Sequence, residues 1–133
     1  MRYIKTMSAN DCGKTTSHQA GMCIPKDKAL LEFLPKLDPA IKNPEAEFIC
    51  VDSSGETWRF RYIYYNNKLH GQGTRNEYRI TRITKFIKKF EIQPGDELII
   101  SRQSEGLYSI EINHKEAPPN AGAVKLRGWR QVY

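Results

Sequence analysis

The sequence has no long apolar run: no stretch approaches the roughly 20 consecutive apolar residues that a membrane-spanning helix requires. Its first residues, MRYIKTMSAND, also lack the apolar core of a secretory signal peptide. These two absences predict a cytoplasmic protein without a membrane span. A chain of 133 residues can bury one hydrophobic core, so we expect residues 1–133 to form a single domain.

Cysteine is scarce. The chain has three cysteines, Cys12, Cys23 and Cys50, and no Cys-x-x-Cys pair. An odd number without paired spacing argues against a disulfide framework and predicts reduced thiols. Cys12, His18 and Cys23 are conceivable zinc ligands, but their spacing fits no common zinc pattern and a fourth ligand is missing. We therefore expect no metal and no cofactor.

Motifs of hydrolytic enzymes are also missing. Residues 13–16 (GKTT) are similar to the end of a phosphate-binding P-loop, but Ser8 stands where that motif needs its first glycine. The Glu-x-Lys tripeptide of many metal-dependent nucleases does not occur. His18, His70 and His114 form no nuclease pattern with a neighbour, and a phosphodiesterase histidine stays an alternative. We expect a domain that is not itself catalytic.

What the chain does have is an excess of positive charge. Its 21 lysines and arginines outnumber 15 acidic residues, which gives a net charge of +6 and a pI of about 9.3. Basic residues crowd between Arg59 and Lys89 and recur at Lys125, Arg127 and Arg130, whereas Asp96 and Glu97 are read as solvated turn residues. This charge favours a polyanionic partner such as nucleic acid.

Alternation and apolar spacing predict seven strands and two short helices. The strands are expected at residues 2–7, 20–24, 47–52, 57–65, 97–102, 107–113 and 124–132. One helix should open at Pro25, with Asp27 complementing its dipole, and the other should be capped by Thr81 or Thr84. Helical spacing marks the core-facing residues as Leu30, Phe33, Leu34 and Leu37 in the first helix, and Ile83, Phe86, Ile87 and Phe90 in the second.

The segment 57–65 (TWRFRYIYY) alternates aromatic residues with arginines. The two-residue period places Trp58, Phe60, Tyr62 and Tyr64 on one face. A half-buried strand is the preferred interpretation, and a stacking platform for single-stranded nucleic acid is the alternative. Because the strands follow one another too closely for βαβ crossovers, we predict a mainly β fold: a largely antiparallel sheet forming an open pseudobarrel whose ends the helices cover.

Two polar stretches interrupt this pattern, Ser8–Gln19 (SANDCGKTTSHQ) and Tyr64–Arg82 (YYNNKLHGQGTRNEYRITR). Each combines cations, carboxylates and amides, the side chains that read base edges as well as phosphates. Such a mixture favours loops that recognise DNA over loops that are merely solvated.

These stretches carry a family resemblance. Tyr3–Lys26 resembles the start of the amino-terminal effector domain of EcoRII-type restriction endonucleases, and Ile63–Arg82 resembles its second DNA-binding arm. Ile83–Ile112 resembles the helix, glycine-aspartate turn and hairpin of the plant B3 DNA-binding domain. The resemblance implies a seven-stranded pseudobarrel that clamps duplex DNA in the major groove between two arms, residues 8–19 and 66–82.

The same resemblance implies an effector domain that binds a copy of the recognition sequence and regulates a separate nuclease domain in the full-length protein. It makes 5'-CCWGG or a close relative the expected site, and we expect a monomer on DNA in a prokaryotic cytoplasm. Two alternatives stay open: a transcription-factor-like module of the same fold without a nuclease partner, and an autonomous nuclease.

Side-chain chemistry then suggests roles within the arms. The candidates for reading bases are Arg75, Arg79 and Lys14 for guanine, Asp11 and Glu77 for cytosine, and Asn10, His18, Gln19, Gln72 and Asn76 for other bases or for bridging the arms. The candidates for holding phosphates are Thr15, Thr16, Ser17, Asn66, Lys68, Arg82, Lys85 and Lys88.

Overall fold

The computed structural model describes residues 1–13, 21–104, 106–115 and 128–132. Within these ranges the chain forms eight strands, two α-helices and one 3-10 helix. In chain order they are β1 (Arg2–Thr6), β2 (Met22–Ile24), α1 (Lys28–Phe33), β3 (Glu45–Val51), β4 (Thr57–Tyr65), η1 (Asn67–His70), β5 (Glu77–Thr81), α2 (Thr84–Lys89), β6 (Glu97–Ser104), β7 (Leu107–Asn113) and β8 (Trp129–Val132).

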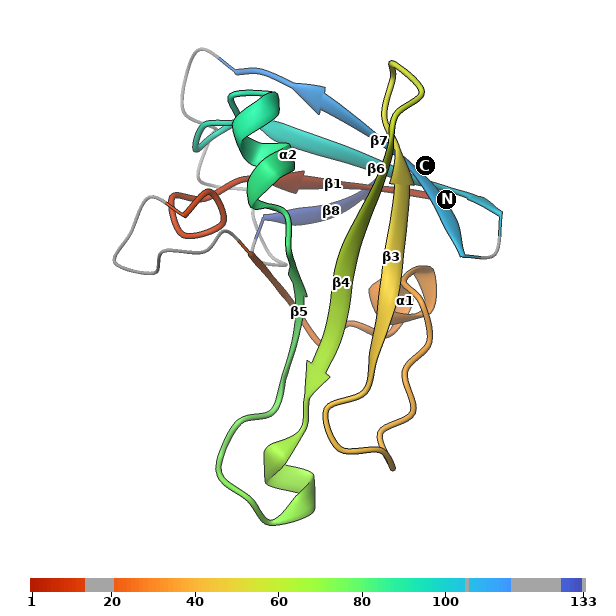
Figure 1. The fold of residues 1–133 in the computed structure, drawn as a ribbon, viewed down its shortest axis with the longest axis vertical. Coiled ribbons are helices and arrows are strands. Elements are labelled where there is room, and N and C mark those ends of the chain that lie inside the picture. Colours follow the sequence, from red (N-terminus) through yellow and green to blue (C-terminus); the bar gives the residue numbers. More distant parts are fainter. Residues whose placement is uncertain (14–20, 105, 116–127, 133) are drawn as a thin grey trace.

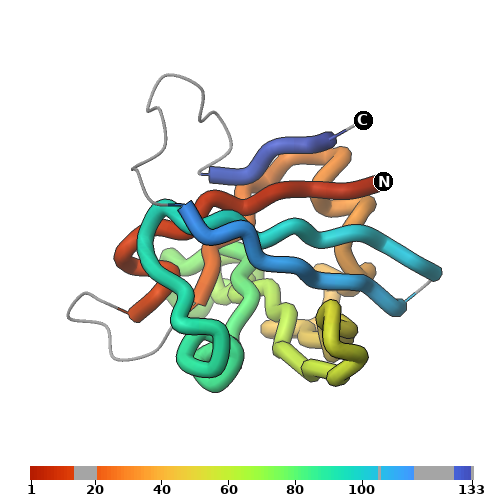
Figure 2. Tube along the Cα trace, turned by 90° about the horizontal axis from the view of Figure 1, so that it is seen from above, coloured from red at the N-terminus to blue at the C-terminus, as the bar shows by residue number. Residues whose placement is uncertain are grey.

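The strands form one curled, open sheet in the order β2-β5-β4-β3-β7-β6-β1-β8 (Figure 1). Neighbouring strands are antiparallel except β3 and β7, which run parallel. Figure 2 shows β8, β1, β6 and β7 lying side by side. The edge strands β8 and β2 meet across the opening, where Trp129 Nε1 donates to the carbonyl oxygen of Cys23 at 3.4 Å. The predicted mainly β pseudobarrel is confirmed.

The expected count of seven strands is wrong, because Glu77–Thr81 is a strand and not part of a loop. β5 pairs with β4 on one side and with β2 on the other. Tyr78 and Ile80 point into the barrel while the polar residues between them face outward, which is the alternation of a half-buried strand. Because this strand has only two apolar residues, its sequence resembles that of a polar loop, and the strand was not predicted.

The core is rich in aromatic rings. The Tyr3 ring lies 4.8 Å from that of Phe33, and the Phe48 ring lies 4.7 Å from that of Tyr108, measured between centroids. The predicted inward face of the first helix is confirmed, because Leu30 and Phe33 are fully buried.

The predicted starts of both helices are wrong. Helix α1 begins at Lys28, and Asp27 caps it by accepting from the backbone N–H of Leu30 at 3.0 Å, as an N-cap does. Helix α2 has Ile83 at its N-cap, without a side-chain cap.

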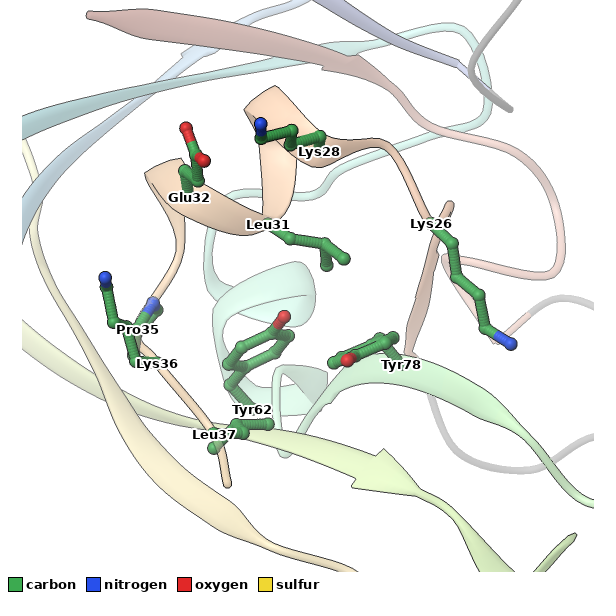
Figure 3. Close-up of a pocket in the computed structure, with 9 residues that line it drawn as sticks. All are labelled: Lys26, Lys28, Leu31, Glu32, Pro35, Lys36, Leu37, Tyr62 and Tyr78. Carbon is green, nitrogen blue, oxygen red and sulfur yellow. The ribbon is translucent and has the colours of Figure 1, made fainter. Parts of the chain in front are cut away.

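Helix α1 packs inside the curled sheet, where the Phe33 ring contacts the rings of Tyr3 on β1 and Tyr108 on β7. An open pocket beside α1 is lined by Tyr62 of β4 and Tyr78 of β5, together with Leu31 and Leu37 (Figure 3). In Figure 3 the Leu31 side chain points toward the tyrosines, whereas that of Lys26 points away from the pocket centre.

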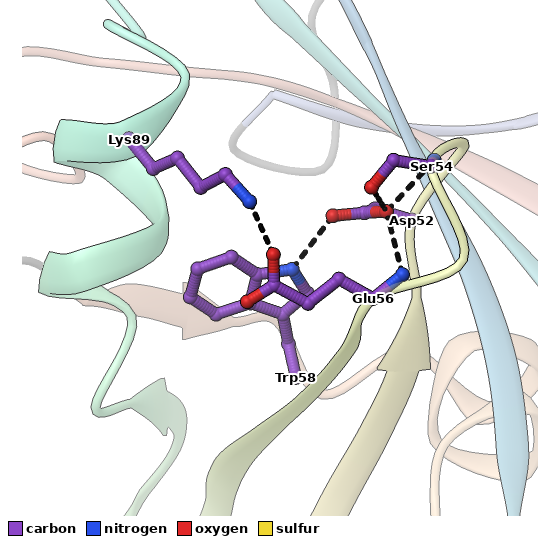
Figure 4. A network of polar contacts seen from close by, with 5 residues as sticks. All are labelled: Asp52, Ser54, Glu56, Trp58 and Lys89. Atoms are coloured by element: carbon purple, nitrogen blue, oxygen red, sulfur yellow. Dashed lines mark hydrogen bonds and ion pairs between the residues drawn. The ribbon is translucent and has the colours of Figure 1, made fainter.

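The turn between β3 and β4 is held by a buried carboxylate, that of Asp52 (Figure 4). Its oxygens accept from Trp58 Nε1 at 2.9 Å, from Ser54 Oγ at 2.6 Å, and from the backbone N–H groups of Ser54 and Glu56. Burial by itself would raise the pKa of Asp52, but these hydrogen bonds outweigh it and lower the pKa to about 2. Lys89 of α2 forms an ion pair with Glu56, which ties the turn to the helix.

Asp96 and Glu97, expected to be solvated turn residues, are buried. Asp96 accepts from the backbone N–H groups of Gln93 at 2.8 Å and Lys115 at 2.9 Å, and from His114 Nδ1 at 2.9 Å. Burial opposes ionisation, but these hydrogen bonds outweigh it and keep the pKa of Asp96 below its ordinary value. The predicted turn before β6 is confirmed. The sequence does not show that His114 and Lys115, which follow β7, form hydrogen bonds with Asp96.

Candidate nucleic-acid interface

The second arm continues the β4–β5 hairpin beyond its last pair, Tyr65 opposite Glu77. In Figure 1 it forms the lower end of the molecule, with η1 at its tip. Gly71 ends η1 with a left-handed backbone at φ 66°, a conformation that favours glycine. The backbone N–H of Lys68 donates to the carbonyl of Arg75 at 3.0 Å and closes the arm on itself. The arm is therefore an ordered extension of the sheet.

Arg75 is held in place at the base of this arm. Its guanidinium carbon lies 3.7 Å from the centroid of the Tyr65 ring, and its Nε donates to Glu77 Oε1 at 2.8 Å. The Tyr65 hydroxyl accepts in turn from Arg61 Nη2 at 3.0 Å. The contact with Glu77 uses one of the five N–H donors of the guanidinium, and the Arg75 side chain is about half exposed (49%). The cluster presents an oriented, solvent-facing cation beside a carboxylate.

An open polar groove, here called the arm groove, runs between residues 23–26 and residues 74–77. Asn76 lines it, and its Oδ1 accepts from the Tyr64 hydroxyl at 2.5 Å. The Tyr64 ring stacks on that of Tyr78 with centroids 4.0 Å apart and planes 4° from parallel. These contacts fix the Asn76 amide, and because its oxygen is engaged, its NH₂ group is the part left to meet a new acceptor.

The two arms share a common base. Cys23 of β2 lies opposite Arg79 of β5. Arg79 Nη2 lies 3.1 Å from the point where a side chain on Gly21 would begin, so a larger residue at position 21 would crowd this guanidinium. The backbone N–H of Gly21 donates to the carbonyl of Asp11 at 3.2 Å. Arg79 therefore sits where the end of the first arm meets the strand that leads out of the second.

Asp11, a candidate for reading cytosine, is 5% exposed. Its carboxylate lies 2.9 Å from the buried Lys5 Nζ and accepts from the backbone N–H of Ser8 at 2.9 Å, while Ser8 Oγ accepts from the N–H of Asp11. This geometry anchors the start of the first arm to β1 and leaves the carboxylate facing inward. Asn10 is exposed on the same turn. Lys14, Thr15, Thr16, Ser17, His18 and Gln19 lie outside the described residues.

Asn66, a candidate for holding phosphate, is fully buried and makes internal hydrogen bonds. Gln72 is exposed and accepts from Lys42 Nζ. The remaining described candidates for phosphate are exposed: Lys68 on the second arm, Arg82 after β5, and Lys85 and Lys88 on α2.

Sequence reasoning missed Tyr65 and Lys26. Tyr65 follows the stripe of aromatic residues directly, so the two-residue period of β4 places it on the opposite face, with Arg61. This two-residue period could have shown from the sequence that Tyr65 lies beside Arg61. Lys26 was expected to open a helix, but α1 begins later and Lys26 lines the arm groove.

The described part of the chain contains no group of three or more His, Cys, Asp or Glu side chains placed to hold a metal ion. Nor does it contain a helix both long and apolar enough to cross a membrane. Cys12, Cys23 and Cys50 are free thiols in the structure.

Residues 1–98 match the family described as "Restriction endonuclease EcoRII, N-terminal". The chain belongs to the EcoRII N-terminal domain family. One relative in sequence is the type II restriction enzyme EcoRII of Escherichia coli, 40% identical over 92 residues that cover 60% of this chain and 20% of the relative. Another is auxin response factor 2 of Oryza sativa subsp. japonica, 29% identical over 119 residues that cover 90% of this chain and 15% of the relative.

Among solved structures, this EcoRII N-terminal domain is similar to the Arabidopsis FUS3–DNA complex. The TM-score is 0.62 at 22% identity, and the match covers 84% of this chain and 94% of the other. The fold is thus shared with the plant B3 type. The chain spans only 15–20% of the length of the two sequence relatives named above.

Proposed function

We propose that this domain binds double-stranded DNA sequence-specifically, by inserting its two arms into the major groove. The observation that carries the proposal is the arrangement of Arg75, stacked on Tyr65 and bonded to Glu77, at the edge of the arm groove. An arginine fork matches O6 and N7 of guanine, and a neighbouring carboxylate can accept from the amine of the paired cytosine. Arg75 and Glu77 together therefore suit a G·C pair.

Other residues complete the proposed interface. The fixed Asn76 amide suits adenine, Arg79 lies where the end of the first arm meets β5, and Asn10 is exposed on the first arm itself. The exposed cations Lys68, Arg82, Lys85 and Lys88 suit phosphates, contacts that position the duplex without reading it. Asp11 and Asn66 leave this set, because their burial gives them structural roles. Lys14, Thr15, Thr16, Ser17, His18 and Gln19 stay candidates by sequence alone.

Membership of the EcoRII N-terminal family supports a finer proposal. The domain serves as the effector part of a type II restriction endonuclease, is itself non-catalytic, and binds 5'-CCWGG or a close relative as a monomer. A catalytic domain elsewhere in the full-length protein is its proposed partner. Restriction acts on DNA in the cell, so we place the protein in the prokaryotic cytoplasm.

The test is a binding titration with a labelled duplex carrying CCAGG against a duplex of the same composition with the site scrambled, both at the same salt concentration. A clear preference for the first duplex supports the proposal, and equal affinity for both refutes it. Because phosphate contacts are salt-dependent, the preference must be measured at several salt concentrations.

A second candidate is a transcription-factor-like module of the same fold. It is favoured by the similarity to auxin response factor 2 across 90% of this chain. Sequencing the gene beyond this segment separates the two. A nuclease domain encoded in the same frame supports the restriction context, and its absence together with specific binding supports the module.

A further inference from the structure

The connector between α1 and β3, residues 38–44, is bonded to the second arm through one buried amide. Asn66 Nδ2 donates to the carbonyls of Pro39 at 3.1 Å and Ile41 at 2.8 Å. Asn66 Oδ1 accepts from the backbone N–H of Asn43 at 2.7 Å, and Asn43 Oδ1 accepts from the N–H of Asn66 at 3.2 Å. All these hydrogen bonds join segments more than twenty residues apart in sequence.

These hydrogen bonds hold the connector and the arm together as a single unit. Asn66 is fully buried and satisfies both ends of its amide on the connector, so separating the two segments would leave buried polar groups without partners. Asn43 adopts a left-handed backbone at φ 50°, which asparagine tolerates better than most residues. His70 adds a contact on the arm side, with Nε2 3.3 Å from the carbonyl of Pro39.

The charge of this unit is positive at its exposed surface. The connector contributes Lys42, which is exposed and donates to Gln72, a neutral amide near the arm tip. The arm contributes Lys68, also exposed. The connector and the arm contain two acidic residues, and both are engaged: Asp38 Oδ1 accepts from the backbone N–H of Ala40 at 2.9 Å, and Glu77 Oε1 accepts from Arg75 Nε at 2.8 Å. Lys42 is thus held near the tip by a neutral partner that a phosphate would readily replace.

We propose that residues 38–44 are a third DNA-contacting segment and that Lys42 binds a backbone phosphate beside the second arm. This inference rests on the proposed DNA-binding function and extends it to a segment that neither arm includes. Lysine binds phosphate as a point charge, so Lys42 contributes affinity and salt dependence and no sequence preference.

The test uses Lys42→Gln and the matched variant Arg2→Gln. Arg2 is exposed on β1, the N-terminus lies away from the second arm in Figure 1, and substitution of Arg2 removes the same charge. Affinity for the CCAGG and scrambled duplexes is measured across a salt series. Lys42→Gln should flatten the slope of log affinity against log salt by about 0.9, the value for one lost phosphate contact. Arg2→Gln should leave the slope unchanged, and Lys42→Arg should restore it.

Two outcomes overturn the inference: a wild-type slope in Lys42→Gln, or equal flattening in Lys42→Gln and Arg2→Gln, which would show an effect of net charge alone. Thermal unfolding of each variant confirms that the fold is kept. Failure of the proposed function is distinct, because it appears as equal affinity of the wild-type domain for both duplexes. The slope of Lys42→Gln on either duplex still decides whether Lys42 contacts phosphate.

Discussion

The stacking of Arg75 on Tyr65 makes a quantitative prediction about DNA recognition. Binding a base edge must immobilise a long arginine side chain, which costs about 0.5–1.5 kcal/mol when the side chain is free to move. In this domain the ring of Tyr65, 3.7 Å away, already holds the guanidinium before DNA arrives. Substituting Tyr65→Leu removes the ring face, so we expect specific binding to weaken by about 1 kcal/mol, or about five-fold.

Two further variants separate the ring from the hydroxyl. Tyr65→Phe keeps the ring beneath Arg75 and loses only the hydrogen bond from Arg61, so it should bind nearly as well as wild type. Arg75→Ala removes the proposed contact with guanine and should cost about 1–3 kcal/mol on the target duplex. In the Arg75→Ala background, Tyr65→Leu should cost nothing further, because there is no guanidinium left to orient.

The assay is equilibrium titration of CCAGG and scrambled duplexes with the wild type, the single variants and the double variant, at one salt concentration. The coupling energy of the double-mutant cycle is the quantity of interest. If Tyr65→Leu weakens binding equally with and without Arg75, the ring does not act through the arginine and the reasoning is refuted. If Arg75→Ala leaves the ratio of affinities for the CCAGG and scrambled duplexes unchanged, Arg75 does not read a base.

Three predictions concern stability. Asp11→Asn removes the carboxylate that pairs with the buried Lys5 ammonium, so urea denaturation should show a loss of about 3–5 kcal/mol, largely recovered when Lys5→Met and Asp11→Leu are combined. Gly128→Ala places a methyl group 2.6 Å from a backbone oxygen of β1 at φ +92°, and its melting temperature should fall as about 2 kcal/mol is lost. The folded-state pKa values of Asp52, about 2, and of Asp96 lie below their ordinary values, so their stabilisation is present above about pH 4 and lost as pH falls toward 2. Denaturation curves at pH 7 and pH 3 measure that loss, which should be smaller in Asp52→Asn.

Regular apolar spacing predicted much of the fold. The strand at residues 57–65 and the inward face of α1 follow from periods of two and of about four residues, and both are confirmed. β5 was missed because Tyr78 and Ile80 are its only large apolar residues, and its place between β4 and β2 makes it a strand. Pairing with neighbouring strands overrode a weak local pattern.

The candidate site was predicted from the residue types in its two arms, and the structure adds the contacts that those residues make. Arg75 was a candidate for guanine and Glu77 a candidate for cytosine, and the structure places the two side chains in contact at the arm groove, a contact that the sequence did not predict. Asp11 and Asn66 carry the same side-chain chemistry as base or phosphate contacts, and only the folded structure shows their partners on β1 and on residues 38–44. A polar residue in a loop sequence does not disclose whether it faces a ligand or its own chain.

The pairing of β2 with β5 is only three residue pairs long, Met22–Ile24 against Tyr78–Ile80, yet it joins the strands that follow the two proposed DNA-binding arms. A slip by one position would turn Arg79 toward the interior and Ile80 toward solvent, since successive side chains on a strand alternate. A variant designed for a new target sequence should therefore carry substitutions at the tips of the arms and keep the residues of the β2–β5 pairing.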